Sequence, residues 1–102
     1  MTNAPIRASD AQVREALASL PGWSVENGKL HRVFQFPNFM EAMHWMAAAA
    51  LIIDELDHHP EWFNVYSTVR VELVTHSAAG ITALDLNLAG RLEALAQRWG
   101  TR

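Results

Sequence analysis

The sequence predicts an α+β fold: a two-layer sandwich, in the order α-β-β-α-β-β-α, with three helices packed on one face of a four-stranded antiparallel sheet. Apolar residues recur at helical spacing in three segments and alternate with polar residues in shorter segments between them. Asn27-Gly28, a pair typical of hairpin turns, makes two alternating segments antiparallel neighbours. Since the helices are amphipathic, they must cover a face of the sheet.

The first helix is predicted to begin at Ser9, because the Ser9 hydroxyl and the Gln12 side chain form a capping box in front of an apolar-periodic segment. Asn27-Gly28 favours a type I′ turn, since both residues tolerate a positive φ. Strands are therefore predicted at about 23–26 and 29–36 on either side of this turn.

The second helix is predicted to run from Phe39 to near Asp57, because Asn38 is a good helix cap and Pro60 prevents continuation. It carries two adjacent apolar stripes, a wider surface than one sheet face covers, so we expect it to make a subunit contact as well. The stripes are Phe39, Met43, Met46, Ala50 and Ile53, and Ala42, Trp45, Ala49, Ile52 and Leu56.

Two further strands are predicted at 63–66 and 69–74, where apolar and polar residues alternate, with a tight Ser67-Thr68 turn between them. Thr82 and Asp85 then form a second capping signature, and the last predicted helix follows it. A sheet of this kind leaves two edge strands, and pairing of two copies at an edge is one way to cover them.

The length of 102 residues and the 50% hydrophobic composition indicate one globular domain. We expect a flexible N-terminal segment at 1–8 and a single domain over 9–102.

The composition also excludes several classes of function. The chain has no cysteine, which removes thiol nucleophiles, disulfides and cysteine-based metal sites. A net charge of −3 without a basic stripe argues against nucleic acid as a partner. The longest apolar run, Trp45 to Ile53, is far shorter than the ~20 residues that span a bilayer, and Met1 to Asp10 is no signal peptide. We expect a cytoplasmic protein with no membrane partner.

Three of the five histidines lie where a scaffold presents reactive side chains. His58 and His59 follow the second helix, and His76 follows the last strand. The negative end of the helix and Asp54, one turn before His58, favour the protonated form of His58, whereas the adjacent His59 opposes it. Such a pair is suited to acid–base chemistry, although it is also compatible with an ordinary solvated helix end.

A metal site is the competing interpretation, in which Asp54 and His58 at i and i+4 chelate an ion together with His76. The His-Glu-x-x-His arrangement is absent, and no serine lies in the context of a nucleophile elbow. Trp62 and Tyr66 either stack on a planar ligand or belong to the core and its rim.

A wider set of residues with fixed gaps resembles the signature of the pterin-4a-carbinolamine dehydratase family. The resemblance is dense over about 54–90 and looser from Ser9 onward, where Leu20-Pro-Gly-Trp23 also fits. Asp54 is a departure, because many relatives have a glutamate there, one methylene longer. The signature positions are Asp54, His58, His59, Pro60, Tyr66, His76 and Asp85.

The resemblance implies a lyase that dehydrates 4a-hydroxytetrahydropterin (4a-hydroxytetrahydrobiopterin) to the quinonoid dihydropterin, which recycles the tetrahydrobiopterin of aromatic amino acid hydroxylases. It implies the fold described above and no metal or organic cofactor. It assigns His58 and His76 as general acids, one for each face of the pterin ring, and His59 as the residue that orients the substrate. Supporting carboxylates would be Asp54, Asp57 and Asp85. Residues lining the pterin site would be His58, His59, Pro60, Trp62, Thr75, His76, Ser77 and Ala78.

The expected assembly is a homodimer or a homotetramer. An alternative of another class is a non-catalytic oligomeric binding module, or a cofactor for a protein partner, that keeps the same fold. The presence of His58, His59 and His76 together favours the enzyme, because an adaptor has no need of all three imidazoles.

Overall fold

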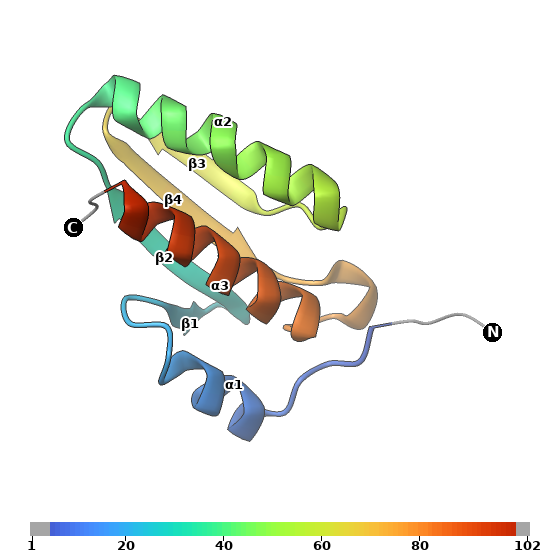
Figure 1. The fold of residues 1–102 in the computed structure, drawn as a ribbon. Helices are drawn as coiled ribbons and strands as arrows, with labels where there is room; N and C mark the ends of the chain where they lie inside the picture. The colour runs from blue at the N-terminus through green and yellow to red at the C-terminus, as the bar shows by residue number, and fades with distance from the viewer. Residues whose placement is uncertain (1–4, 100–102) are drawn as a thin grey trace.

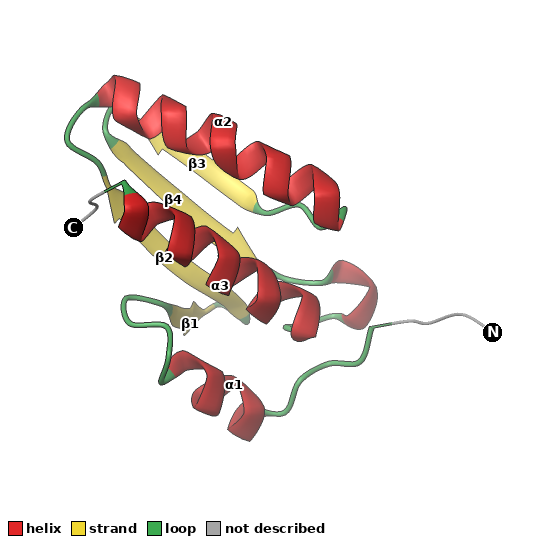
Figure 2. Cartoon of the chain, viewed as in Figure 1, coloured by secondary structure: helices red, strands yellow, loops and turns green. Residues whose placement is uncertain are grey.

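A computed structural model describes residues 5–99 and shows a four-stranded antiparallel sheet with helices on one side (Figures 1 and 2). The fold class and the element order agree with the sequence-based prediction. The elements are α1 (Asp10–Leu17), β1 (Ser24–Glu26), β2 (Lys29–Gln35), α2 (Phe39–Leu56), β3 (Glu61–Val65), β4 (Thr68–Leu73), the 3₁₀ turn η1 (His76–Ala78) and α3 (Ala83–Arg98).

The strand order in the sheet is β1-β2-β4-β3, and every neighbouring pair is antiparallel. The long strands β2 and β4 form the centre, with Leu30 opposite Leu73 and Phe34 opposite Val69. α2 and α3 cross the same face of this sheet, and α1 lies beside β1 (Figure 1). The end of α2 and the start of α3 therefore meet at the same end of the molecule.

The core lies between the sheet and these two helices. Leu30 and Phe34 of β2 and every second residue of β4 from 69 to 73 are fully buried there, as the period of a half-buried strand requires. Trp45 of α2 packs on the ring of Phe34 with centroids 4.8 Å apart. Because the helices cover one face of the sheet only, the residues between the buried ones point to the uncovered face. The largest fully buried apolar side chains are Trp45, Phe34, Leu30, Leu73, Leu88, Leu92, Val69 and Val71.

The turn between the last two strands differs from the prediction. β3 begins at Glu61 and ends at Val65, so the turn is Tyr66-Ser67 and not Ser67-Thr68. Tyr66 has a φ of 54°, and the Asn64 side chain donates to the carbonyl oxygens of Tyr66 and Thr68 at 3.1 and 3.0 Å. This side-chain clamp stabilises a left-handed tyrosine, a conformation that residue preferences disfavour.

The predicted capping boxes at Ser9 and Thr82 are both present. Two residues of the N-terminal segment, Arg7 and Ala8, lie against the start of α3: Arg7 forms a bridge with Thr82, and the Ala8 amide donates to the Ile81 carbonyl at 2.8 Å. Of the two segments expected from the sequence, 1–8 and 9–102, the residues 1–4 and 100–102 lie outside those that the structure describes.

The two apolar stripes of α2 differ in how deeply they are buried. In the second stripe, Ala42, Trp45 and Ala49 are fully buried, whereas Phe39 at the start of the first stripe is 42% exposed. Leu51, outside both stripes, is 74% exposed. A mainly apolar helix thus keeps apolar side chains on its outer side. Among residues 5–99, no helix combines the length and hydropathy needed to cross a bilayer.

Candidate active site

The end of α2 is a sharp turn that carries His58 away from the helix. Asp57 adopts the left-handed conformation, with a φ of 50°, and the His58 amide donates to the Ile53 carbonyl at 3.4 Å. His58 therefore lies beyond the helix. Asp54 and His58 do not lie side by side on one helix face, as their i and i+4 spacing predicted. Asp54 is exposed at this end of α2.

The carboxylate that contacts His58 comes from α3. Nε2 of His58 lies 2.5 Å from Oδ1 of Asp85, whose side chain is completely buried, and only 12% of the His58 side chain is exposed. The other oxygen, Oδ2, accepts the Thr75 hydroxyl and the Thr82 amide, each at 2.8 Å. A buried carboxylate with this many donors is held in one orientation, and it fixes Nε2 of His58 as a donor.

Asp85 both caps the start of α3 and orients His58. It is the third residue of α3, and its bond to the Thr82 amide completes the capping box at the start of that helix. The hydroxyls of Thr75 and Thr82 are also 2.8 Å apart, so the end of the β4 segment and the start of α3 are joined through side chains. The same interactions that begin the helix orient the imidazole.

His76 follows Thr75 directly and opens the 3₁₀ turn η1. Its side chain is 79% exposed, and its Nε2 lies 3.5 Å from Oε2 of Glu61, the first residue of β3. Oε1 of Glu61 accepts from Nζ of Lys29 at 2.6 Å. The hydrogen bond from Lys29 lowers the pKa of Glu61, and the same bond raises the pKa of Lys29.

The three histidines belong to a closed ring of contacts and chain neighbours. His58 contacts Asp85, Asp85 contacts Thr75, and Thr75 is followed by His76. His76 faces Glu61, and Glu61 is joined through Pro60 to the His58-His59 pair. Folding thus brings the end of α2, the end of the β4 segment and the start of β3 to one corner of the molecule.

This corner is open to solvent. The His59 side chain is 61% exposed and lies 3.5 Å from Oδ1 of Asp57, which is 93% exposed. A hollow of about 860 Å³ lies elsewhere, between α1 and the segment 79–81, and the three histidines are not among the residues that line it. At the corner, the side chains of His59 and His76 are accessible to a ligand from outside the fold, whereas that of His58 is largely buried.

The remaining predicted residues divide into two groups. Pro60, Thr75, Ser77 and Ala78 belong to the segments of the corner, with Thr75 buried, Ala78 partly buried and Ser77 exposed. Trp62 is half-buried and its ring lies 6.3 Å from that of Trp45, so it packs on the core. Tyr66 lies at the far end of β3, about 16 Å along the strand from Glu61 at 3.3 Å per residue.

The metal interpretation finds no support in the geometry of the described residues. Across residues 5–99, no group of three or more His, Asp or Glu side chains is arranged to hold a metal ion. In particular, Asp54, His58 and His76 do not form one, because His58 points to Asp85 instead.

Two residues of the corner were not foreseen from the sequence, Lys29 and Glu61. Glu61 stands inside the histidine-rich segment and was a visible candidate. Lys29 was not, because it lies in β2 and reaches Glu61 only through the pairing of β2 with β4 and of β4 with β3. A contact across three strands leaves no signal in local spacing.

Comparisons with known proteins show which family the chain resembles. The family model described as pterin 4 alpha carbinolamine dehydratase matches residues 6–95. Two relatives provisionally named pterin-4-alpha-carbinolamine dehydratases are 47% identical over 90 residues (Solibacter usitatus; 88% of this chain and 95% of that protein) and 50% identical over 94 residues (Afipia carboxidovorans; 90% and 94%).

A crystal structure from Brucella melitensis, described as a transcriptional coactivator/pterin dehydratase, superposes with a TM-score of 0.84 at 44% identity, covering 88% of this chain and 98% of that one. Its fold is that of the present protein, and the family match spans both the sheet and the histidine corner. The chain therefore belongs to the pterin-4-alpha-carbinolamine dehydratase family.

Proposed function

We propose that this protein is a cytoplasmic lyase that dehydrates 4a-hydroxytetrahydropterin to the quinonoid dihydropterin, and so takes part in recycling the pterin used by aromatic amino acid hydroxylases. Two findings support the proposal. The family match covers residues 6–95, and the histidines with their carboxylates form a closed ring at one accessible corner. The ring is the observation that carries the proposal, since it gathers histidines from two segments of the chain, 58–59 and 76, that are distant in sequence.

The reaction needs a proton donor and a proton acceptor. The C4a–O bond breaks as an acid protonates the hydroxyl, which departs as water. The lone pair of the adjacent ring nitrogen forms the new C=N bond, and that nitrogen loses its proton to a base. The overall change releases one water molecule and needs no oxidant or reductant. Positioned acid–base side chains typically accelerate such steps by about 10² to 10⁴-fold.

In this proposal, His58 and His76 are the general acids. Because Nε2 of His58 donates to Asp85, Nδ1 is left as the nitrogen that takes up a proton and delivers it to the leaving hydroxyl. His76, on the other side of the ring of contacts, does the same for the opposite face of the pterin. His59 contacts and orients the substrate, and the exposed Ser77 with the partly buried Pro60 and Ala78 completes the binding surface.

The test is the ultraviolet absorbance of freshly generated 4a-hydroxytetrahydropterin, followed with and without the protein. We expect the wild-type protein to accelerate the loss of substrate clearly above the spontaneous rate. His58→Ala should lower the enzymatic rate by about 10² to 10⁴-fold, because it removes a general acid.

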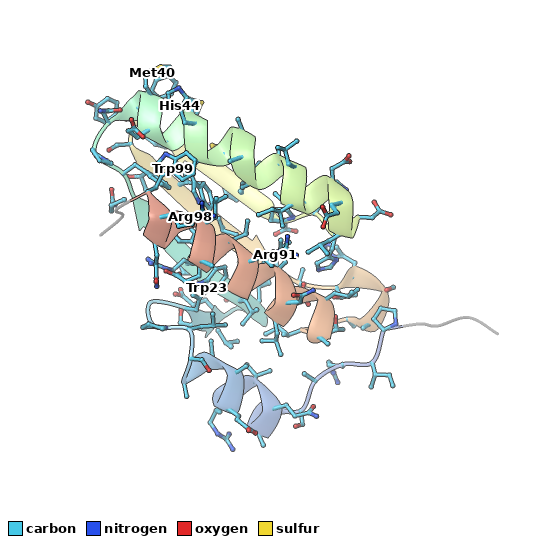
Figure 3. All side chains as sticks on the ribbon, in the orientation of Figure 1. Trp23, Met40, His44, Arg91, Arg98 and Trp99 are labelled. Atoms are coloured by element: carbon cyan, nitrogen blue, oxygen red, sulfur yellow. The ribbon has the colours of Figure 1, made fainter. Side chains whose placement is uncertain are left out.

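A suitable control is His44→Ala. His44 is exposed on the outer side of α2 (Figure 3), about 18 Å along the helix from Leu56 at 1.5 Å per residue. The His44→Ala variant should dehydrate the substrate at the wild-type rate. A wild-type rate equal to the spontaneous one would overturn the proposal and favour a non-catalytic binding module, the other half of the description carried by the Brucella melitensis protein.

A further inference from the structure

His76 has a backbone held by hydrogen bonds and a largely exposed ring. The Ala79 amide donates to its carbonyl at 3.0 Å, and Thr75 and Gly80 on either side exchange backbone hydrogen bonds at 3.0 and 3.3 Å. The side chain, in contrast, is the most exposed of the three histidines, 79% against 61% for His59 and 12% for His58. The backbone brings this imidazole to a defined point, so its orientation depends on a neighbouring side chain.

Glu61 is that neighbour, and its two carboxylate oxygens have separate partners. Oε1 accepts from Lys29 at 2.6 Å, and Oε2 lies 3.5 Å from Nε2 of His76. The side chains of Lys29 and Glu61 are only 30% and 37% exposed. The carboxylate is consequently held on one side and presents its free oxygen to the imidazole on the other.

Lys29 is itself well placed for this role. It follows the Asn27-Gly28 turn, whose residues have φ values of 54° and 76°, and it is the first residue of β2, paired with Glu26. Its hydrogen bond lowers the pKa of Glu61, so the carboxylate stays ionised at neutral pH. The Lys29 ammonium and the Glu61 carboxylate are therefore both charged at neutral pH.

The neighbouring pair of His59 and Asp57 is a comparison in which the carboxylate is not held by a lysine. The distance between its nitrogen and oxygen is also 3.5 Å, but the Asp57 side chain is 93% exposed. A solvated carboxylate of this kind keeps most of its conformational freedom and is screened by water. Glu61 differs from Asp57 in being tied to the sheet by Lys29.

We propose that Glu61, anchored by Lys29, is a positioning residue for His76: it turns Nε2 of the imidazole toward the sheet and leaves Nδ1 facing outward to deliver a proton to the substrate. This inference rests on the proposed function, since the substrate of that proton transfer is the pterin. It adds a role for two residues that touch neither the pterin nor its reacting atoms.

The charges around this pair determine the expected direction of a pH effect. Lys29 comes from β2, Glu61 from β3 and Glu72 from β4, and Glu72 in turn lies 3.3 Å from Nδ1 of His31. Removing the negative charge of Glu61 leaves the positive charge of Lys29 facing His76, which disfavours the protonated imidazole. Removing the charge of Lys29 favours the protonated imidazole of His76, but it also frees the Glu61 carboxylate from its anchor.

The test compares Glu61→Gln with Lys29→Met and Lys29→Arg in the dehydratase assay. Glu61→Gln should lower kcat by about tenfold, less than the 10² to 10⁴-fold for loss of a general acid, and move the alkaline limb of the pH–rate profile down by about half to one pH unit. Lys29→Met should lower kcat severalfold without that downward movement and with KM nearly unchanged. Lys29→Arg should restore kcat.

A merely structural role is distinguished by combining the changes. In a His76→Ala background, Glu61→Gln should have no further effect on kcat, because the residue that it positions is gone. If Glu61→Gln lowers kcat equally in the wild-type and His76→Ala backgrounds, the positioning role is wrong.

A second readout does not depend on activity. Imidazole ¹⁵N chemical shifts of the ligand-free protein should show the neutral ring of His76 protonated at Nε2 in the wild type and a mixture of tautomers in Glu61→Gln, with His59 unchanged. A mixture already in the wild type would overturn the positioning role. A wild-type protein with the expected tautomer but no rate above the spontaneous one would overturn the proposed function alone.

Discussion

At the scale of single residues, the most consequential side chain is one carboxylate that serves both folding and chemistry. Asp85 is fully buried, accepts from Thr75 and Thr82, and contacts His58. Of the carboxylates that the family resemblance assigned to support imidazoles, Asp54 is exposed and Asp57 lies near His59 in solvent. The support of His58 therefore depends on position 85.

This difference predicts unequal effects of two matched substitutions. Asp85→Asn should lower dehydratase activity by at least tenfold and also lower the free energy of unfolding, because it removes the charge that a buried imidazole and two other donors share. Asp54→Asn should change both by little. Steady-state rates measure the activity of the two variants, and urea unfolding measures their free energy of unfolding. Equal losses of activity and stability in both variants would contradict the geometry.

Local signals in the sequence explain why several of these residues were predictable. The capping boxes at Ser9 and Thr82 and the Asn27-Gly28 turn depend on residues within four positions of one another, so their spacing is visible in the chain. The Tyr66 turn was misplaced because a side-chain clamp from Asn64 overrides the residue preference. The family resemblance gave Asp85 only as a supporting carboxylate. Its contact with His58 follows from the fold, because the two residues are 27 positions apart in the chain.

At the scale of secondary-structure elements, α3 is held to the sheet by a buried ion pair. Arg32 of β2 donates to both oxygens of Glu93 at 2.9 and 3.2 Å, and the indole of Trp23 donates to the same carboxylate at 2.7 Å. Figure 3 shows Trp23 between α3 and the start of β1. Nothing in the sequence indicated this network, because Glu93 is 61 residues from Arg32 and 70 residues from Trp23.

The network predicts a large difference between two Glu–Arg pairs. Glu93→Ala should lower the free energy of unfolding by about 3 kcal/mol, because Arg32 is left buried without its partner, with side-chain exposures of 12% and 7% for Arg32 and Glu93. The exposed pair of Glu55 and Arg91, 3.9 Å apart, is the control: Glu55→Ala should cost less than about 1 kcal/mol. Denaturant unfolding of both variants measures the two free-energy changes; a loss in Glu93→Ala no larger than that in Glu55→Ala would contradict the prediction.

The same pair makes stability sensitive to acid. Burial raises the pKa of Glu93, but the hydrogen bonds from Arg32 and Trp23 outweigh burial, and the pKa lies below the ordinary value of 4.5. Its contribution to stability is therefore present above pH 4.5 and is lost as the pH falls through the lower pKa of the folded state. Between neutral pH and strong acid, the wild type should lose more stability than Glu93→Gln does.

At the scale of the whole molecule, α2 keeps apolar side chains on its outer side. Phe39, Met40 and Leu51 are 42%, 56% and 74% exposed, and Met40 lies on the side of the helix that faces away from the sheet (Figure 3). The two apolar stripes predict a subunit contact on this helix, and the exposed apolar side chains are consistent with that prediction. The number of subunits stays a prediction.

We expect the protein to elute from a sizing column at the mass of a dimer or a tetramer of its 11.4 kDa chain. Leu51→Glu should shift elution toward the monomer, since it places a charge in an apolar contact. His44→Glu, also on the exposed side of α2, tests whether any added charge has this effect. Elution of the wild type as a monomer would contradict the expected assembly.

The short N-terminal pairing has a consequence for how the chain can be altered. Arg7 donates to the Ala79 carbonyl at 3.1 Å and Ala8 to the Ile81 carbonyl, so both brace the loop that leads from His76 to α3. An expression tag placed directly before Arg7, or a truncation that starts at Ser9, would act on that loop from outside the sheet. Arg7 and Ala8 are for this reason positions to keep intact when the protein is truncated or fused to a tag.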